Sequence, residues 1–239
     1  MTRPGDTRTA AIMQPTYLPY LGYFHLIAAC DVFVFLDDVQ FARRSWQQRN
    51  RILGADGEVM LSVPVQKTDR DAAIGEIEVS EAEPWRDKHL ASIRHAYARR
   101  PFFAEGMAFL EDQFATPAGK LADLNCGLIQ TAARRLELTP AFVRASTLGA
   151  GGQRSEHLLA ICRAAGASDY LSPMGSHDYM IEDGVFANAG FPARFQGFVE
   201  IAYPQGREPF TPFMAFIDAV MNLGWAGTRA LIDRMAAHS

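Results

Sequence analysis

The chain has 239 residues, of which 49% are hydrophobic and 21% are charged, and its formal net charge is −4 at pH 7. This length and apolar content support a sizeable buried core and exclude a disordered protein. The acidic balance argues against nucleic-acid binding through an overall positive field. No apolar run reaches the roughly 18 residues that span a bilayer, and the start MTRPGDTRTA lacks the apolar core of a signal peptide, so we expect no transmembrane segment and a cytoplasmic protein.

Three cysteines, Cys30, Cys126 and Cys162, lie far apart in apolar helical patterns. Their odd number and spacing predict buried structural thiols and no metal site of the CxxC type. A nucleophilic Cys30, close to His25 in the sequence, is the minor alternative.

Two short apolar runs near the start predict buried strands, at 10–13 and 32–36. Residues 20–29 between them have the length and pattern of a helix, with Pro19 suited to its first turn. The unit is therefore β-loop-α-β. In an open parallel sheet, ligands bind outside the carboxyl ends of the strands, so the residues after each run become candidates for a site.

The remaining pattern predicts an α/β fold with a Rossmann-like, mostly parallel sheet, in a single domain over 1–239. A hairpin of 51–53 with 58–65, paired with a strand at 74–79, would form an antiparallel extension. Residues 84–138 predict a subdomain of three helices, with His89 and His95 as surface or edge histidines. Further expected elements are strands at 142–146, 169–172 and 193–198, a helix capped by Ser155, and a last helix at 212–223.

Polar residues follow the first two predicted strands. Gln14 and Tyr17 come after the first, and we expect Tyr17 to lie in a pocket. Asp37, Asp38 and Gln40 come after the second. Adjacent residues on an extended chain point to opposite faces, so only one aspartate need face the site, for catalysis or a metal, while the other caps a turn or pairs with an arginine; a structural role for both is the alternative.

His25 is the best-placed general base in this part of the sequence, with packing in the core as the alternative reading. An arginine-rich segment at 43–51 is predicted to clamp an anion and stack a planar group, unless it is a solvated loop. Its candidate binding residues are Trp46, Arg49, Asn50 and Arg51, with Arg43 and Arg44 beside them.

A second polar loop, at 172–179, follows the predicted strand 169–172. Ser172 and Ser176 are its candidate phosphate-binding groups, because hydroxyls and free N–H groups at a helix start suit an anion. A simple helix-capping turn is the alternative.

Many separate motifs resemble the WbqC-like protein family in their order and spacing, over nearly the whole chain. They include QPTYLPYLGYF at 14–24, DVFVFLDDVQF at 31–41, WQQRNRI at 46–52, SEHLLAIC at 155–162, YLSPMGSHDY at 170–179 and IDAVMNLG at 217–224. The resemblance implies a bacterial protein often encoded among genes for O-antigen and other surface-polysaccharide biosynthesis, with transferase activity described as aminoacyl or glycyl transfer to a sugar. It assigns no catalytic residue.

From this resemblance we expect acyl or aminoacyl transfer to an amino sugar carried on a nucleotide or lipid. Asp37, Asp38 or His25 would deprotonate the attacking amine, Gln14 and Gln40 would position it, and the arginine loop would hold phosphate. The alternatives are a metal-dependent glycosyltransferase that uses a nucleotide sugar, and a non-catalytic binding module of a biosynthetic complex. The partner is thus a small-molecule or carrier-linked sugar, while the sequence indicates no particular cofactor or oligomeric state.

Overall fold

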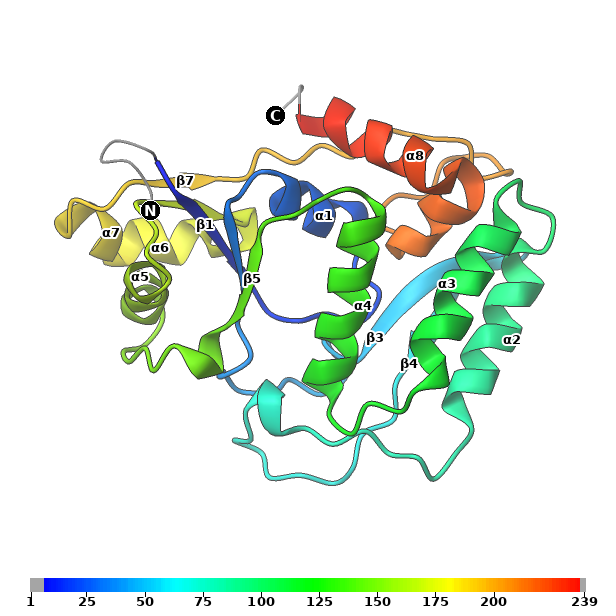
Figure 1. Ribbon diagram of the computed structural model, residues 1–239, viewed down its shortest axis with the longest axis horizontal. Helices are drawn as coiled ribbons and strands as arrows, with labels where there is room; N and C mark the ends of the chain where they lie inside the picture. Colours follow the sequence, from blue (N-terminus) through cyan, green and yellow to red (C-terminus); the bar gives the residue numbers. More distant parts are fainter. Residues whose placement is uncertain (1–6, 237–239) are drawn as a thin grey trace.

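A five-stranded parallel sheet organises the described part of the chain, residues 7–236 of the computed structural model (Figure 1). Its strand order is β5-β2-β1-β6-β7, and every neighbouring pair is parallel. This confirms the predicted α/β fold. The strands are β1 (Thr9–Met13), β2 (Val32–Phe35), β5 (Ala141–Arg144), β6 (Asp169–Ser172) and β7 (Ala193–Phe195).

Helices cover both faces of this sheet, on the two sides seen in Figure 1. One face packs against α1 (Leu21–Ala28), α4 (Leu121–Arg135) and α8 (Phe216–Ala236). The other face packs against α5 (Ser155–Ala164), α6 (His177–Asp183) and α7 (Val185–Asn188).

The central strands are buried on both sides because successive side chains point to opposite faces. In β2, Phe33 and Phe35 belong to the larger core cluster, whereas Val32 and Val34 belong to the smaller one. This is why β1 and β2 read as continuous apolar runs rather than as alternating patterns.

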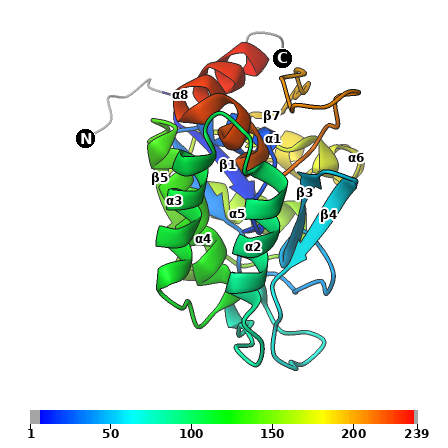
Figure 2. The same ribbon diagram turned by 90° about the vertical axis from the view of Figure 1, so that its right-hand side faces the viewer.

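The predicted hairpin forms a separate two-stranded sheet of β3 (Arg49–Gly54) and β4 (Gly57–Ser62). It stands beside α2 (Trp85–Tyr97), as Figure 2 shows, and the Leu53 N–H donates to the Tyr97 hydroxyl at 3.0 Å. Residues 84–138 also contain α3 (Phe103–Ala115), which gives the three predicted helices with α2 and α4.

The strand predicted at 74–79 is wrong. Residues Ile74–Glu76 form a 3-10 turn, and only isolated bridges follow, including Val65 with Val79. The turn forms because the chain after β2 binds this segment: the Ile74 N–H donates to the Val39 carbonyl at 2.9 Å and the Gly75 N–H to the Asp37 carbonyl at 2.7 Å.

Two helix ends also differ from expectation. Ser155 does not cap α5; it is the first helical residue, Arg154 precedes it, and no side-chain cap bond forms. The last helix runs to Ala236 but is interrupted at Gly224, which has φ 70° and marks the end expected from the sequence. A Cβ at Gly224 would lie 2.7 Å from the Phe102 ring, so both the backbone angle and the space favour glycine. Between 7 and 236, no helix is both long and apolar enough to cross a membrane.

Candidate functional site

A groove lies at the carboxyl end of β1, the central strand, which pairs with β2 on one side and with β6 on the other. In open parallel sheets, a crevice forms at the strand ends where the strand order reverses. One half of the groove, which we call the polar lobe, is a cavity of about 380 Å³. Its lining includes Met13, Gln14, Gln47, Pro173, Ser176 and Tyr179.

The other half, which we call the apolar lobe, is a cavity of about 330 Å³. Four aromatic rings line it, and Asn50 and Arg51 are among the residues that add polar groups to the lining. Met13, Thr16 and Trp46 line both lobes, so the lobes are neighbours with a shared wall. The four rings belong to Tyr20, Tyr23, Trp46 and Phe213.

Side-chain amides fix the walls of this groove, because each amide can donate and accept at once. Gln47 is 2% exposed. Its Nε2 donates to Gln14 Oε1 at 2.9 Å, and its Oε1 accepts the Ala42 N–H at 3.0 Å. Gln14 and Gln47 therefore join the end of β1 to the loop between β2 and β3.

Two buried asparagines hold the neighbouring turn. The Asn125 Nδ2 donates to the carbonyls of Pro15 at 3.0 Å and Gln47 at 2.7 Å. The Asn50 Nδ2 donates to the carbonyls of Tyr17 at 3.2 Å and Leu18 at 2.7 Å. Asn50, predicted to bind substrate, thus lines the apolar lobe and also supports its backbone. Sequence reasoning missed Asn125, since its partners lie far away in the chain.

Asp37 is fully buried and has a complete set of partners. Its carboxylate accepts Arg144 Nε at 2.7 Å, the Ser146 N–H at 2.9 Å and the Ser146 hydroxyl at 2.8 Å. These contacts join the ends of β2 and β5 and match the structural alternative considered for this residue. Among residues 7–236, no group of three or more His, Cys, Asp or Glu side chains is arranged to hold a metal ion.

Asp38 faces a histidine that sequence reasoning did not single out. The His157 Nε2 lies 3.2 Å from Asp38 Oδ1, and its Nδ1 lies 3.3 Å from the Gly151 carbonyl. Asp38 and His157 do not themselves line the polar lobe, but Leu36, two residues before Asp38, and Leu158, directly after His157, do. The only available signal was a histidine in the first turn of the predicted helix at 155.

Tyr17 and His25 lie in the core rather than in the groove. Tyr17 has no exposed surface, and its hydroxyl lies 2.8 Å from His89 Nδ1. His25 is 4% exposed, and its Nδ1 lies 2.7 Å from Gln196 Nε2. Burial lowers the pKa of His25, and burial raises the pKa of the nearby Cys30 to about 12, which disfavours a thiolate nucleophile there.

The arginines of the predicted clamp do not converge. Arg51 lines the apolar lobe, where its Nη1 lies 2.9 Å from Glu58 Oε2. Arg49 is half-buried at the start of β3, and its Nε has no hydrogen-bond partner. Arg43 lines a third cavity of about 460 Å³ with Gln40 and Arg70.

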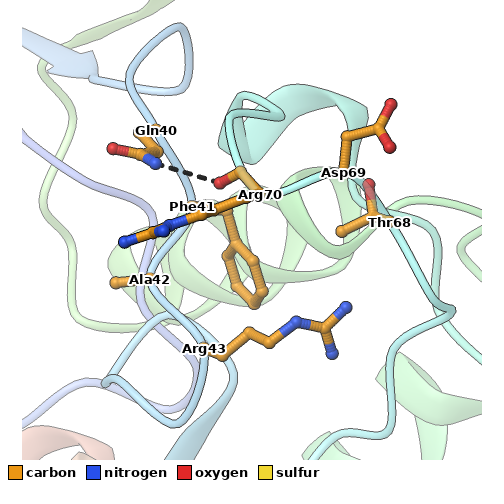
Figure 3. Close-up of a pocket in the computed structure, with 7 residues that line it drawn as sticks. All are labelled: Gln40, Phe41, Ala42, Arg43, Thr68, Asp69 and Arg70. Carbon is orange, nitrogen blue, oxygen red and sulfur yellow. Dashed lines mark hydrogen bonds between the residues drawn. The ribbon is translucent and has the colours of Figure 1, made fainter.

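Figure 3 shows this third cavity, with the Arg43 and Arg70 side chains on either side of the Phe41 ring. The Gln40 Nε2 donates to the Arg70 carbonyl at 2.9 Å and to Asp71 Oδ1 at 3.1 Å, which ties the two loops of the cavity together. Gln40 therefore lines a different cavity from Gln14, although both were predicted to position one substrate.

Ser172 and Ser176 are neighbours at the end of β6. Ser172 has no exposed surface, and its hydroxyl bonds to that of Ser176. The Ser176 hydroxyl donates a hydrogen bond to the Pro173 carbonyl at 2.8 Å, and Ser176 lines the polar lobe. Of the predicted residues, the groove therefore brings together Gln14, Trp46, Asn50, Arg51 and Ser176.

Comparison with known proteins gives a family and a relative. The model of the WbqC-like protein family matches residues 14–230. The uncharacterized protein Rv1507c of Mycobacterium tuberculosis is 27% identical over 225 residues, covering 91% of this chain and 94% of that protein. No solved structure gives a significant match. Because the family model covers residues 14–230 of the 239, the chain belongs to the WbqC-like protein family.

Proposed function

We propose that the protein is a transferase of bacterial surface-polysaccharide biosynthesis, of the O-antigen type, which moves an acyl or aminoacyl group, such as glycyl, to an amino sugar. The observation that carries this proposal is the two-lobed groove at the carboxyl end of β1. Two adjoining cavities that share Thr16 and Trp46 suit a reaction with a donor and an acceptor, because both reactants must be held side by side.

In this proposal the amine nitrogen of the sugar attacks the carbonyl carbon of the donor. The new carbon–nitrogen bond forms as the bond from the acyl carbon to the donor's leaving group breaks, and the amine proton passes to the Asp38 carboxylate. Asp38 is favoured over Asp37 and His25 because 22% of its side chain is exposed, whereas theirs are buried. His157 is then a positioning residue that orients Asp38.

The test is an assay by mass spectrometry for a product in which an amino sugar has gained an acyl or glycyl group. Donors would include acyl-coenzyme A and aminoacyl compounds, and acceptors would include nucleotide-linked and lipid-linked amino sugars. For the productive pair, Asp38→Asn should lower turnover by about 100-fold or more, since a positioned base contributes at least that much.

The matched control is Asp178→Asn, which changes a fully exposed aspartate on α6. Its turnover should equal that of the unchanged protein. Full activity of Asp38→Asn would refute the assigned base. Tight binding of a donor or acceptor without any turnover would instead indicate the non-catalytic binding module, and turnover of a nucleotide sugar only with a divalent metal would indicate a glycosyltransferase.

A further inference from the structure

We infer that the apolar lobe binds the base of a nucleotide, so that the amino sugar arrives linked to a nucleotide and not to a lipid. This inference rests on the proposed function and selects between the two carriers that it allows. It concerns one cavity of about 330 Å³, between the end of β1, the loop after β2 and the segment before α8.

Exposed aromatic rings are the first reason. Trp46 is 51% exposed and Phe213 is 48% exposed, yet both line this one cavity. The Tyr20 ring meets the Phe213 ring edge to face, with 5.8 Å between centroids, and Arg51 Cζ lies 6.0 Å from the Trp46 ring centroid. Flat faces of this kind bind nucleobases by stacking, which each base permits because it has a π-face.

Backbone strain is the second reason. Leu18, Arg44 and Phe213 have φ values of 42°, 59° and 58°, a left-handed conformation that side chains disfavour. Each lies in or beside a segment that lines the lobe. Such strain persists where the surrounding structure enforces it, commonly at ligand sites. The Phe213 N–H, for example, is held by Glu200 Oε2 at 2.6 Å.

Polar groups in the lining distinguish a base from a lipid chain. The Thr16 hydroxyl has no hydrogen-bond partner. The Asn50 Oδ1 accepts the Arg51 N–H at 2.8 Å and keeps a second lone pair. Both groups are already buried by the protein, and a hydrocarbon chain would leave them unpaired, whereas the edge of a base carries donors and acceptors that can pair with them.

The test is isothermal titration of the full chain with uridine, cytidine, adenosine and guanosine diphosphates, and with inorganic pyrophosphate as the probe without a base. At least one nucleoside diphosphate should bind with a Kd below about 1 mM, and pyrophosphate should bind about tenfold more weakly or not at all. Trp46→Ala should weaken the nucleotide by about tenfold or more, because base stacking is lost. Thr16→Val, which keeps the side-chain shape, should weaken it by about fivefold.

The matched control is Ile181→Ala, which removes a 64% exposed apolar side chain on α6 outside the lobe and should leave Kd unchanged. The inference fails if no nucleoside diphosphate binds, if pyrophosphate binds as tightly, or if Trp46→Ala and Thr16→Val both bind like the control. Transfer to a lipid-linked amino sugar without nucleotide binding would refute this inference and leave the proposed function intact. Nucleotide binding without any acyl transfer would support this inference and refute the proposed function.

Discussion

Replacing Asp218 with alanine should lower the free energy of unfolding by about 3–5 kcal/mol, because two buried hydroxyl donors would lose the carboxylate that accepts from both. Asp218 lies on α8 with no exposed surface. Its carboxylate accepts the hydroxyls of Tyr97 at 2.8 Å and Tyr203 at 2.7 Å, and the Gln205 amide at 3.0 Å. Burial raises the pKa of this carboxyl, while these donors oppose the rise. Alanine would leave the hydroxyl donors of Tyr97 and Tyr203 buried without an acceptor, whereas the Gln205 amide would keep its bond to the Thr211 carbonyl at 2.9 Å.

The measurement is urea unfolding of the Asp218→Ala variant beside Asp233→Ala. Asp233 lies on the same helix but pairs with Arg229 at the surface, where such i,i+4 pairs contribute about 0.3–0.5 kcal/mol. A loss of similar size in both variants would contradict the assigned role of the Asp218 network. The Tyr97 hydroxyl also accepts the Leu53 N–H, so the network ties α8 and α2 to the hairpin.

Acidification should destabilise the protein by up to about 3 kcal/mol through His89 alone. His89 was expected to be a surface or edge histidine, but it is 6% exposed, its ring centroid lies 5.2 Å from that of Trp85, and it is hydrogen-bonded to the Tyr17 hydroxyl. His89 lies on the face of α2 that packs against the core. Burial lowers the pKa of His89 from 6.5 to about 4.

The direction of this change in stability follows from which state of the chain binds a proton at His89. Between pH 6.5 and about pH 4, the unfolded chain binds a proton at His89 and the folded chain does not. The stability linked to His89 is therefore complete above pH 6.5, falls as the pH drops through this window, and levels off below about pH 4.

Urea unfolding as a function of pH measures this effect. The stability difference between wild type and His89→Gln should shrink as the pH falls through the window, because glutamine does not titrate there. His95→Gln is the control, since it makes the same substitution at an exposed position of the same helix. A stability difference for His89→Gln that stays constant with pH would show that the burial of His89 does not govern its proton binding.

The parts of the fold that were predictable are those set by local patterns. The apolar runs of β1 and β2, the turn of the hairpin and the prolines between the middle helices all carry their signal within a few residues. The prediction of a strand at 74–79 was wrong because the first residues of this segment bond to the chain after β2, where they form a 3-10 turn, and Val79 keeps only an isolated bridge to Val65.

The sequence predicts the position of the site better than the role of each residue in it. Strand ends pointed to Gln14, Trp46 and Ser176, which line the groove. The role of Asp37 was hidden, because its partner Arg144 is 107 positions away and only the parallel pairing of β2 with β5 brings them together. The same holds for Asp38, whose neighbour His157 is 119 positions away.

Because β1 lies in the middle of the sheet, it needs both β2 and β6 to pair its two edges. The strand is synthesised long before its partner β6, because Thr9 pairs with Asp169, 160 positions later. At about 5–20 residues per second, a ribosome needs roughly 10–30 s to supply that partner. During this interval one edge of an apolar strand is open to other chains. A chain that ends before β6 would keep that edge open permanently, so truncated products should aggregate even though every residue of β1 and β2 is present.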